Sequence, residues 1–178
     1  MQIALVPISA VDSSILKILG NALSEEFGGS FSVADPLPSP EYAYVKRRGQ
    51  YLSDAIMAQL SGLALSADRV LGIVDLDLYT SELNFIFGQA NISGREAIIA
   101  LPRLRQEFYG LVSDRTLFQE RAIKEAVHEL GHTFGLRHCR NAKCVMCFSN
   151  SLQDVDRKHA RFCPACRRKL AGSQQPSH

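Results

Sequence analysis

The sequence predicts an α/β fold, with a mostly parallel sheet flanked by helices and one antiparallel strand. Apolar runs typical of buried strands alternate with segments that carry apolar side chains at helical spacing. The last two predicted strands, residues 84–90 and 96–102, are separated only by a turn at residues 91–94, so this pair supplies the antiparallel strand. With 178 residues and 46% hydrophobic content, the chain has the size and composition of a single compact domain.

The first predicted elements are a strand at residues 2–8 and a helix at residues 11–27. The pair Asp12-Ser13 offers a capping side chain at the start of the helix. The pair Gly28-Gly29 ends it, because glycine adopts the backbone conformations that stop a helix. The apolar residues of this helix recur at helical spacing: Ile15, Leu16, Ile18, Leu19, Ala22 and Leu23.

The middle of the chain continues the alternation. Residues 31–34 form a short predicted strand, and the proline-rich segment at residues 35–40 is a loop. A second helix is expected around residues 50–65, and residues 69–78 read as a buried strand. These elements complete the strand–helix–strand order that favours a parallel sheet.

A histidine-rich motif, His128-Glu129-Leu130-Gly131-His132 continued to His138, is the most informative stretch of the chain. His128 and His132 are one helical turn apart, so both imidazoles project from one face and can share a metal ion. Gly135 can end the helix and reverse the chain, which brings His138 back as a third ligand. Three nitrogen ligands leave one tetrahedral position open for water, which is typical of a catalytic zinc site.

The simpler alternative is a helix that carries two histidines by chance, since the five-residue motif alone has low specificity. The extension through Gly135 to His138 adds spacings that the coordination geometry demands and favours zinc. Thr116 with Gln119 makes a plausible capping box for a half-buried helix of about twenty residues. Its apolar stripe consists of Ile123, Ala126, Val127, Leu130 and Phe134.

All five cysteines lie between residues 139 and 166, and the first 138 residues contain none. This distribution does not fit a disulfide scaffold, and paired cysteines in a reduced compartment more often hold metal. Spacing alone selects Cys144 with Cys147 and Cys163 with Cys166, two pairs of structural-zinc type. That choice leaves Cys139 unused.

The N-terminal segment, the apolar runs and the net charge indicate where the protein is located and which partners it binds. The segment Met1–Pro7 has no basic region of a signal peptide, and no apolar run approaches the ~18 residues of a membrane span. We therefore expect a cytoplasmic, monomeric protein. A net charge of +2 does not predict binding to nucleic acid or to a membrane. The polar tail at residues 171–178 is expected to be disordered.

The stretch from His128 to Cys166 resembles the archaemetzincins, a metzincin-type metalloprotease family of archaea and vertebrates. The family pattern joins the histidine motif to Cys-x4-Cys-x-Met and then to a distant Cys-x2-Cys. The resemblance also includes the segments at residues 74–79 and 84–88, so it covers most of the chain. The matching positions after the histidines are Cys139, Cys144, Met146, Cys163 and Cys166.

This resemblance implies a metzincin-like three-layer fold with an active-site helix and a small zinc-stabilised C-terminal lobe. Within one catalytic domain at residues 1–170, residues 1–135 would form the upper part with the sheet and the active-site helix. Residues 136–170 would form the lobe. Residues 85–90 would be the antiparallel edge strand that bounds the cleft and pairs with extended substrate, although their alternation alone fits an ordinary strand equally well.

The resemblance also implies two zinc ions per chain. The second would be structural, and Met146 would lie in the turn beneath the catalytic metal. Cys147 would then be a free thiol, poorly placed to reach the second zinc while its neighbour packs under the first. The two cysteine assignments conflict, and we adopt that of the family. In that assignment, the four ligands of the second zinc would be Cys139, Cys144, Cys163 and Cys166.

The expected chemistry is amide hydrolysis, with a peptide substrate favoured by the resemblance. Zinc held by three histidines lowers the pKa of its water towards ~7. Glu129 takes the proton from that water and delivers it to the leaving amine. Three alternatives stay open. They are a hydrolase of small amides, a nucleic-acid-binding zinc knuckle with Arg167, Arg168 and Lys169, and a latent or narrowly specific fold with an occluded cleft.

Two weaker candidates lie outside these motifs. Asp75 and Asp77 end a predicted strand, where acidic pairs sometimes bind metal but more often cap and solvate a loop. Arg105 and Tyr109 come shortly before the histidine helix and could line a cleft.

Overall fold

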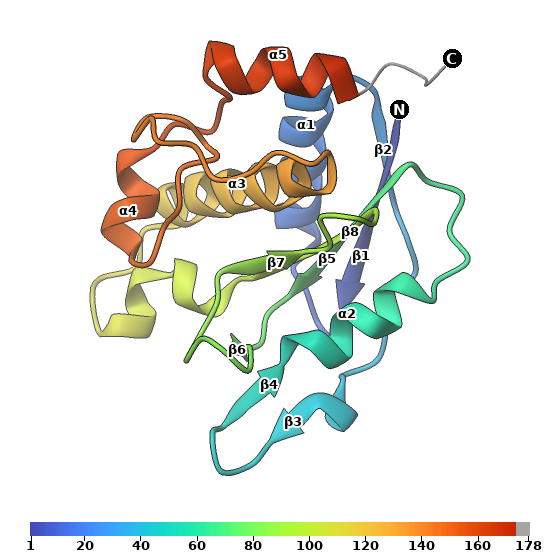
Figure 1. The fold of residues 1–178 in the computed structure, drawn as a ribbon. Helices are drawn as coiled ribbons and strands as arrows, with labels where there is room; N and C mark the ends of the chain where they lie inside the picture. Colours follow the sequence, from blue (N-terminus) through green and yellow to red (C-terminus); the bar gives the residue numbers. More distant parts are fainter. Residues whose placement is uncertain (174–178) are drawn as a thin grey trace.

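The computed structural model describes residues 1–173 (Figure 1). Its main sheet has five strands in the order β2-β1-β5-β8-β7. Four of them run parallel, and β7 pairs antiparallel with β8 at one edge. The mostly parallel sheet with one antiparallel edge strand is confirmed. The bounds are Gln2–Ile8 for β1, Ser30–Val33 for β2, Arg69–Val74 for β5, Gly88–Ala90 for β7 and Glu96–Ala100 for β8.

A second, three-stranded sheet has the order β3-β4-β6, with β3 at Tyr44–Val45, β4 at Gln50–Leu52 and β6 at Leu78–Tyr79. The helices are α1 (Ser13–Phe27), α2 (Ser53–Ser61), α3 (Arg115–Thr133), α4 (Leu152–Arg157) and α5 (Pro164–Ser173). Short 3₁₀ turns lie at Glu41–Ala43, Pro102–Leu104 and Gln106–Tyr109. Within residues 1–173, no helix is both long enough and apolar enough to cross a membrane.

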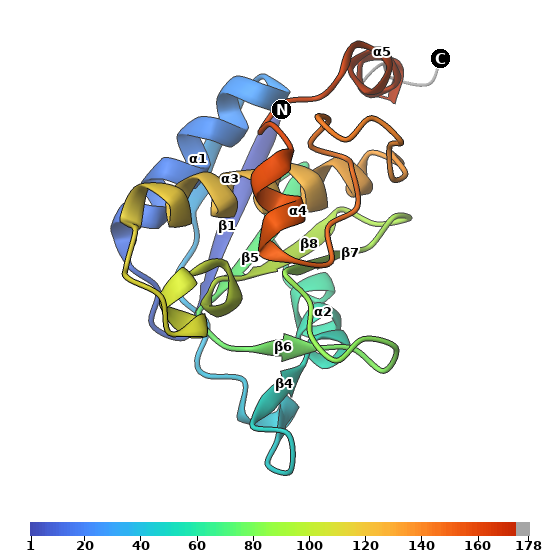
Figure 2. The same cartoon turned by 90° about the vertical axis from the view of Figure 1, so that its left-hand side faces the viewer.

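Helices cover both faces of the main sheet and produce three layers (Figures 1 and 2). Successive side chains of a strand point to opposite faces. In β1, Leu5 packs in the cluster that contains residues of α1 and α3, whereas Val6 packs in the cluster of α2. Both residues are at most 1% exposed. The continuous apolar run of β1 follows from this burial on two sides.

The helix that carries the histidine motif is confirmed, with 19 residues, but its cap differs from the prediction. Asp114 is the N-cap, and its carboxylate accepts a hydrogen bond of 2.9 Å from the Leu117 N–H. Thr116 with Gln119 therefore does not form the expected capping box. An aspartate and a threonine two positions apart are both good caps, so local sequence alone does not choose between them.

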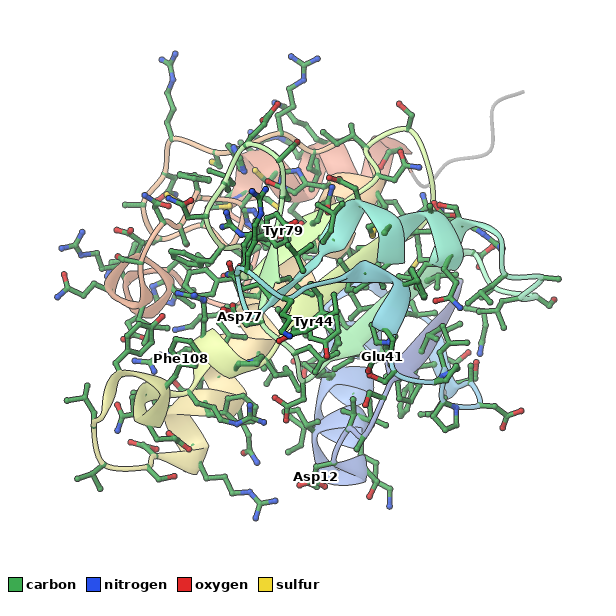
Figure 3. The ribbon with its side chains drawn as sticks, turned by 90° about the horizontal axis from the view of Figure 1, so that it is seen from below. Asp12, Glu41, Tyr44, Asp77, Tyr79 and Phe108 are labelled. Carbon is green, nitrogen blue, oxygen red and sulfur yellow. The ribbon has the colours of Figure 1, made fainter. Side chains whose placement is uncertain are left out.

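Three other segments are shorter than predicted. The strand expected at residues 84–90 is limited to β7 at residues 88–90. The strand expected at residues 69–78 ends at Val74, because Asp75 and Asp77 turn out of the sheet to pair with arginines. The helix expected at residues 50–65 is limited to α2, since residues 50–52 extend the small sheet. Figure 3 views the molecule from below and places Asp77 close to this small sheet, which carries Tyr44 and Tyr79.

The C-terminal part differs most from the sequence-based prediction. Residues 151–154 resemble a capping box and predict a helix from there to near Phe162, but α4 ends at Arg157, and α5 was not predicted. The tail expected to be disordered from Ala171 is helical through Ser173, and residues 174–178 lie outside the described residues. The fully buried Leu170 anchors this last helix in the core cluster of α1 and α3. That long-range contact leaves little trace in local sequence.

Candidate active site

The histidine motif occupies the C-terminal half of α3 and the turn that follows. α3 ends at Thr133, and Gly135 then adopts a φ of +77°, a left-handed conformation that favours glycine. The chain reverses there and brings His138 back beside the helix. The ring centroids of His128 and His138 lie 5.4 Å apart, and those of His132 and His138 lie 5.0 Å apart. The third histidine therefore lies where the spacing predicts.

Hydrogen bonds to the backbone orient the two helical rings. The Nδ1–H of His128 donates to the Val145 carbonyl at 2.7 Å, and that of His132 donates to the Leu136 carbonyl at 2.6 Å. A carbonyl oxygen only accepts, so each ring must carry its proton on Nδ1. Each Nε2 of a neutral ring then presents a lone pair, and the two Nε2 atoms lie 3.1 Å apart. Two facing lone pairs repel unless they share a cation, so these residues fit a bound metal ion.

The environment of the three rings favours their neutral form. Burial lowers the pKa of His128 well below its ordinary value, and burial also lowers the pKa of His132. For His138 the pKa is lowered first by burial and then by the positive charge of Lys158. A neutral imidazole is the form that binds zinc. The three candidate ligand atoms lie within 4.8 Å of one another.

Glu129 lies beside the histidines and is 7% exposed. Burial raises the pKa of its carboxyl well above the usual range, and the nearby charge of Glu125 raises it further. The ammonium of Lys158 acts in the opposite direction. Lys158 forms a buried ion pair of 2.9 Å with Glu125. Glu129 is therefore a carboxyl group held in a poorly solvated position, as a general base that works near neutral pH requires.

A cleft of about 430 Å³ opens over these side chains. Its lining includes Glu125, His128, Glu129 and His132 of α3 together with His138 from the turn that follows. Residues 82, 83, 85–90 and 92 form one wall, and residues 148–150 form another. Phe148 is 52% exposed, and its ring centroid lies 5.0 Å from that of His138.

A second hollow of about 530 Å³ lies beside Met1 and Phe134, but none of the potential metal-binding groups found among the described residues lines it.

Met146 is fully buried against α3. A Cβ atom on Gly131 would lie only 2.6 Å from the Met146 sulfur, so the absence of a side chain at that point of the helix makes room for the thioether. The Cys139 N–H donates to the Met146 carbonyl at 2.9 Å, which ties this turn to the residue after His138. Met146 thus lies beneath the helical turn that joins the two helical histidines.

Four of the five cysteines converge, and one of them, Cys139, directly follows His138 in the sequence. The sulfur atoms of Cys139 and Cys163 lie 3.8 Å apart, and Cys147 does not belong to the group. At that distance no disulfide joins them. The four sulfur atoms within 4.8 Å of one another are those of Cys139, Cys144, Cys163 and Cys166.

The thiols of this cluster differ in their tendency to ionise. A hydrogen bond involving the Cys166 backbone is the main cause that lowers the pKa of Cys163 to about 7. Burial raises the pKa of Cys144 and of Cys166. Two buried and two half-buried thiols that converge without forming a disulfide fit a metal ion that would bind them as thiolates.

The profile of Peptidase family M54 matches residues 37–172. This chain belongs to peptidase family M54. It is 45% identical over 173 residues to the archaemetzincin of Methanocaldococcus jannaschii, covering 96% of this chain and 93% of that protein. It is 52% identical over 127 residues to the archaemetzincin of Methanopyrus kandleri, covering 71% of this chain and 69% of that protein. The M54 chain is thus a zinc metallopeptidase, and the resemblance noted in the sequence is confirmed.

Solved structures agree with this assignment. The crystal structure of the Methanopyrus kandleri archaemetzincin matches the M54 chain with a TM-score of 0.86 and 44% identity, covering 97% of this chain and 94% of that one. The crystal structure of the Archaeoglobus fulgidus archaemetzincin, complexed with malonate, matches with a TM-score of 0.83 and 38% identity, covering 95% of this chain and 99% of that one. The expected fold class is confirmed.

Several residues around the site of the M54 chain were not singled out by the sequence analysis. Glu125 lies one turn before Glu129 on the same face of α3, which is the one signal that could have found it. Lys158 and Phe148 reach the site through the tertiary fold. The weaker candidates have other roles, since Asp75 and Asp77 pair with Arg105 and Arg103. Neither Arg105 nor Tyr109 lines the cleft.

Proposed function

We propose that the M54 chain hydrolyses peptide bonds with one zinc ion bound by His128, His132 and His138. The observation that carries this proposal is the pair of Nε2 atoms 3.1 Å apart, each on a ring whose Nδ1–H already donates to a carbonyl. Bound zinc supplies an acidified water and polarises the carbonyl of the substrate. Glu129 accepts the proton of the attacking water and passes it to the leaving nitrogen.

The edge strand supports a peptide as the substrate. β7 pairs with β8 on one side only, so its other edge offers backbone groups to an extended chain. This edge borders the cleft, next to Glu129. A peptide added there would place its backbone alongside the histidines. A small amide would gain nothing from such an edge, and a nucleic-acid-binding module would not need the cleft.

The apolar walls of the cleft favour substrates with an apolar side chain near the scissile bond. Leu83 and Phe85 contribute to one wall, and Phe148 contributes to the other. Phe148→Ala is expected to raise KM for such peptides about fivefold, which corresponds to about 1 kcal/mol of aromatic contact. Zinc content should not change. A peptide series assayed at fixed zinc measures this, and unchanged KM values would show that Phe148 does not contact substrate.

We further propose that the four converging cysteines bind a second, structural zinc. The site would fasten residues 136–170 as a lobe of one domain at residues 1–170, since it joins the segment after α3 to α5. A closed four-thiolate site of this kind adds to folding stability. Met146 would support the first zinc from below through its contact with Gly131.

Two zinc ions per chain are therefore the expected metal content after expression in zinc-replete medium. The open three-histidine site should lose its metal to a chelator first, and the closed cysteine site should hold its metal longer. Elemental analysis before and after graded chelation measures the number of zinc ions per chain and the order in which they are lost. One zinc per chain at the outset would contradict the second site.

A digest of a broad peptide library tests the proposed activity. Cleavage at apolar positions supports it. If the zinc-loaded protein cleaves nothing, the latent fold with an occluded cleft is the better account. The cytoplasmic location and the monomeric state expected from the sequence stay predictions.

A further inference from the structure

We propose that Gly88 is a positioning residue for Glu129, because the missing side chain at this point of β7 leaves the space that the Glu129 side chain occupies. The inference rests on the proposed function of Glu129 as the general base. Gly88 itself touches no reacting atom in this account. Its role is to let the edge strand and α3 approach each other.

The distances leave no room for a methyl group. A Cβ atom on Gly88 would lie 2.5 Å from Glu129 Cγ and 2.8 Å from Glu129 Oε1. Real Cβ atoms essentially never approach another heavy atom so closely. Gly88 does not have a positive φ, so its backbone conformation does not demand glycine. The contact with Glu129 therefore explains the glycine better than backbone conformation does.

The register of β7 directs position 88 at the helix. Gly88 pairs with Ile99, whose side chain packs in the cluster of α1 and α3. Gln89 points to the other face, where its amide donates to Asp54 of α2 at 2.8 Å. The next position on the α3 side is Ala90. The α3-facing row of this strand thus contains only a glycine and an alanine.

Packing is what holds Glu129 in place. Among residues 1–173, its carboxylate has no hydrogen-bond or ion-pair partner, although the side chain is buried. Its chain is enclosed by α3, from which it projects, and by the backbone of β7 at Gly88. A side chain without polar anchors takes its position from the atoms around it. A new methyl group at position 88 would therefore move Glu129.

Gly88→Ala should lower kcat about a hundredfold, because a displacement near 1 Å of a catalytic group costs about that much in rate. KM should change by less than about threefold, which is small beside that loss. Zinc content should equal that of the wild-type protein, since the histidines are untouched. Gly62→Ala is the matched control, because its Cβ would meet nothing closer than 3.5 Å. Unchanged kcat, or a higher KM with unchanged kcat, would overturn the proposal.

Thermal unfolding of the full-length protein as purified provides a second test that needs no activity. A Cβ at position 88 would also lie 2.8 Å from the Ile98 carbonyl oxygen. The test must therefore separate a loss of stability caused by this backbone contact from one caused by the contact with Glu129. The expected fall in Tm for Gly88→Ala is on the order of 5 °C. In a Glu129→Ala background that fall should largely vanish, whereas in a Glu129→Gln background it should persist.

A fall in Tm that is equally large in the Glu129→Ala background would assign the cost to Ile98 and overturn the inference. If Gly88→Ala alone does not fold, the double variant must still fold as well as Glu129→Ala does. These measurements do not depend on catalysis. They therefore distinguish a failure of the Gly88 inference from a failure of the proposed function.

Discussion

Glu129→Gln is expected to lower the peptidase kcat by at least about a hundredfold while leaving both zinc ions and the fold in place, because a positioned general base contributes roughly 10²–10⁴ in rate. Glutamine has nearly the same shape but cannot take up the proton of the attacking water. KM should change much less than kcat. Steady-state kinetics on a cleaved library peptide, with zinc analysis of the same sample, measures this effect.

His132→Ala is the contrasting variant, since it should lose the catalytic zinc together with the activity. The Glu129→Gln protein should instead keep its metal. If Glu129→Gln cleaves as fast as the wild type, Glu129 is not the general base, however well the spacing of the motif fits.

Cys139→Ser is expected to remove one zinc ion per chain and to lower Tm by an amount on the order of 10 °C, because a structural zinc site contributes folding free energy directly. Cys139 lies 3.8 Å from Cys163, sulfur to sulfur, within the converging group. Cys147→Ser is the matched substitution outside that group and should leave the metal content and Tm nearly unchanged. Zinc analysis and calorimetry of the two variants compare them directly.

The reverse outcome would favour the assignment from spacing alone. In that case Cys147 would belong to the second site, and the ligand set implied by family resemblance would be wrong.

The histidine site was predictable because its geometry is local. His128 and His132 are placed by the helical period, and Gly135 then turns the chain within a few residues. No distant part of the fold is needed to bring the three rings together. The cysteine cluster is different, since Cys139 and Cys163 are 24 positions apart and meet only through tertiary packing. Spacing alone selected a set that includes Cys147 and omits Cys139, whereas family resemblance selected the four cysteines that converge.

The parts that sequence missed depend on tertiary contacts. Leu170 docks α5 onto a distant core cluster, and the helix has too few apolar residues to be recognised from periodicity alone. Phe148 reaches His138 from a loop without regular pattern. The end of β5 was overestimated because residues 75–78 continue the apolar alternation, while Asp75 is drawn away by an ion pair of 2.6 Å with Arg105.

Stepwise removal of zinc, with peptidase activity measured at each step, tests most directly whether the zinc held by the three histidines is the catalytic metal. Activity should disappear in proportion to the first zinc ion lost, while the second ion and the fold remain, and added zinc should restore the activity. Full activity in protein whose three-histidine site has been emptied would show that this zinc is not the catalytic metal.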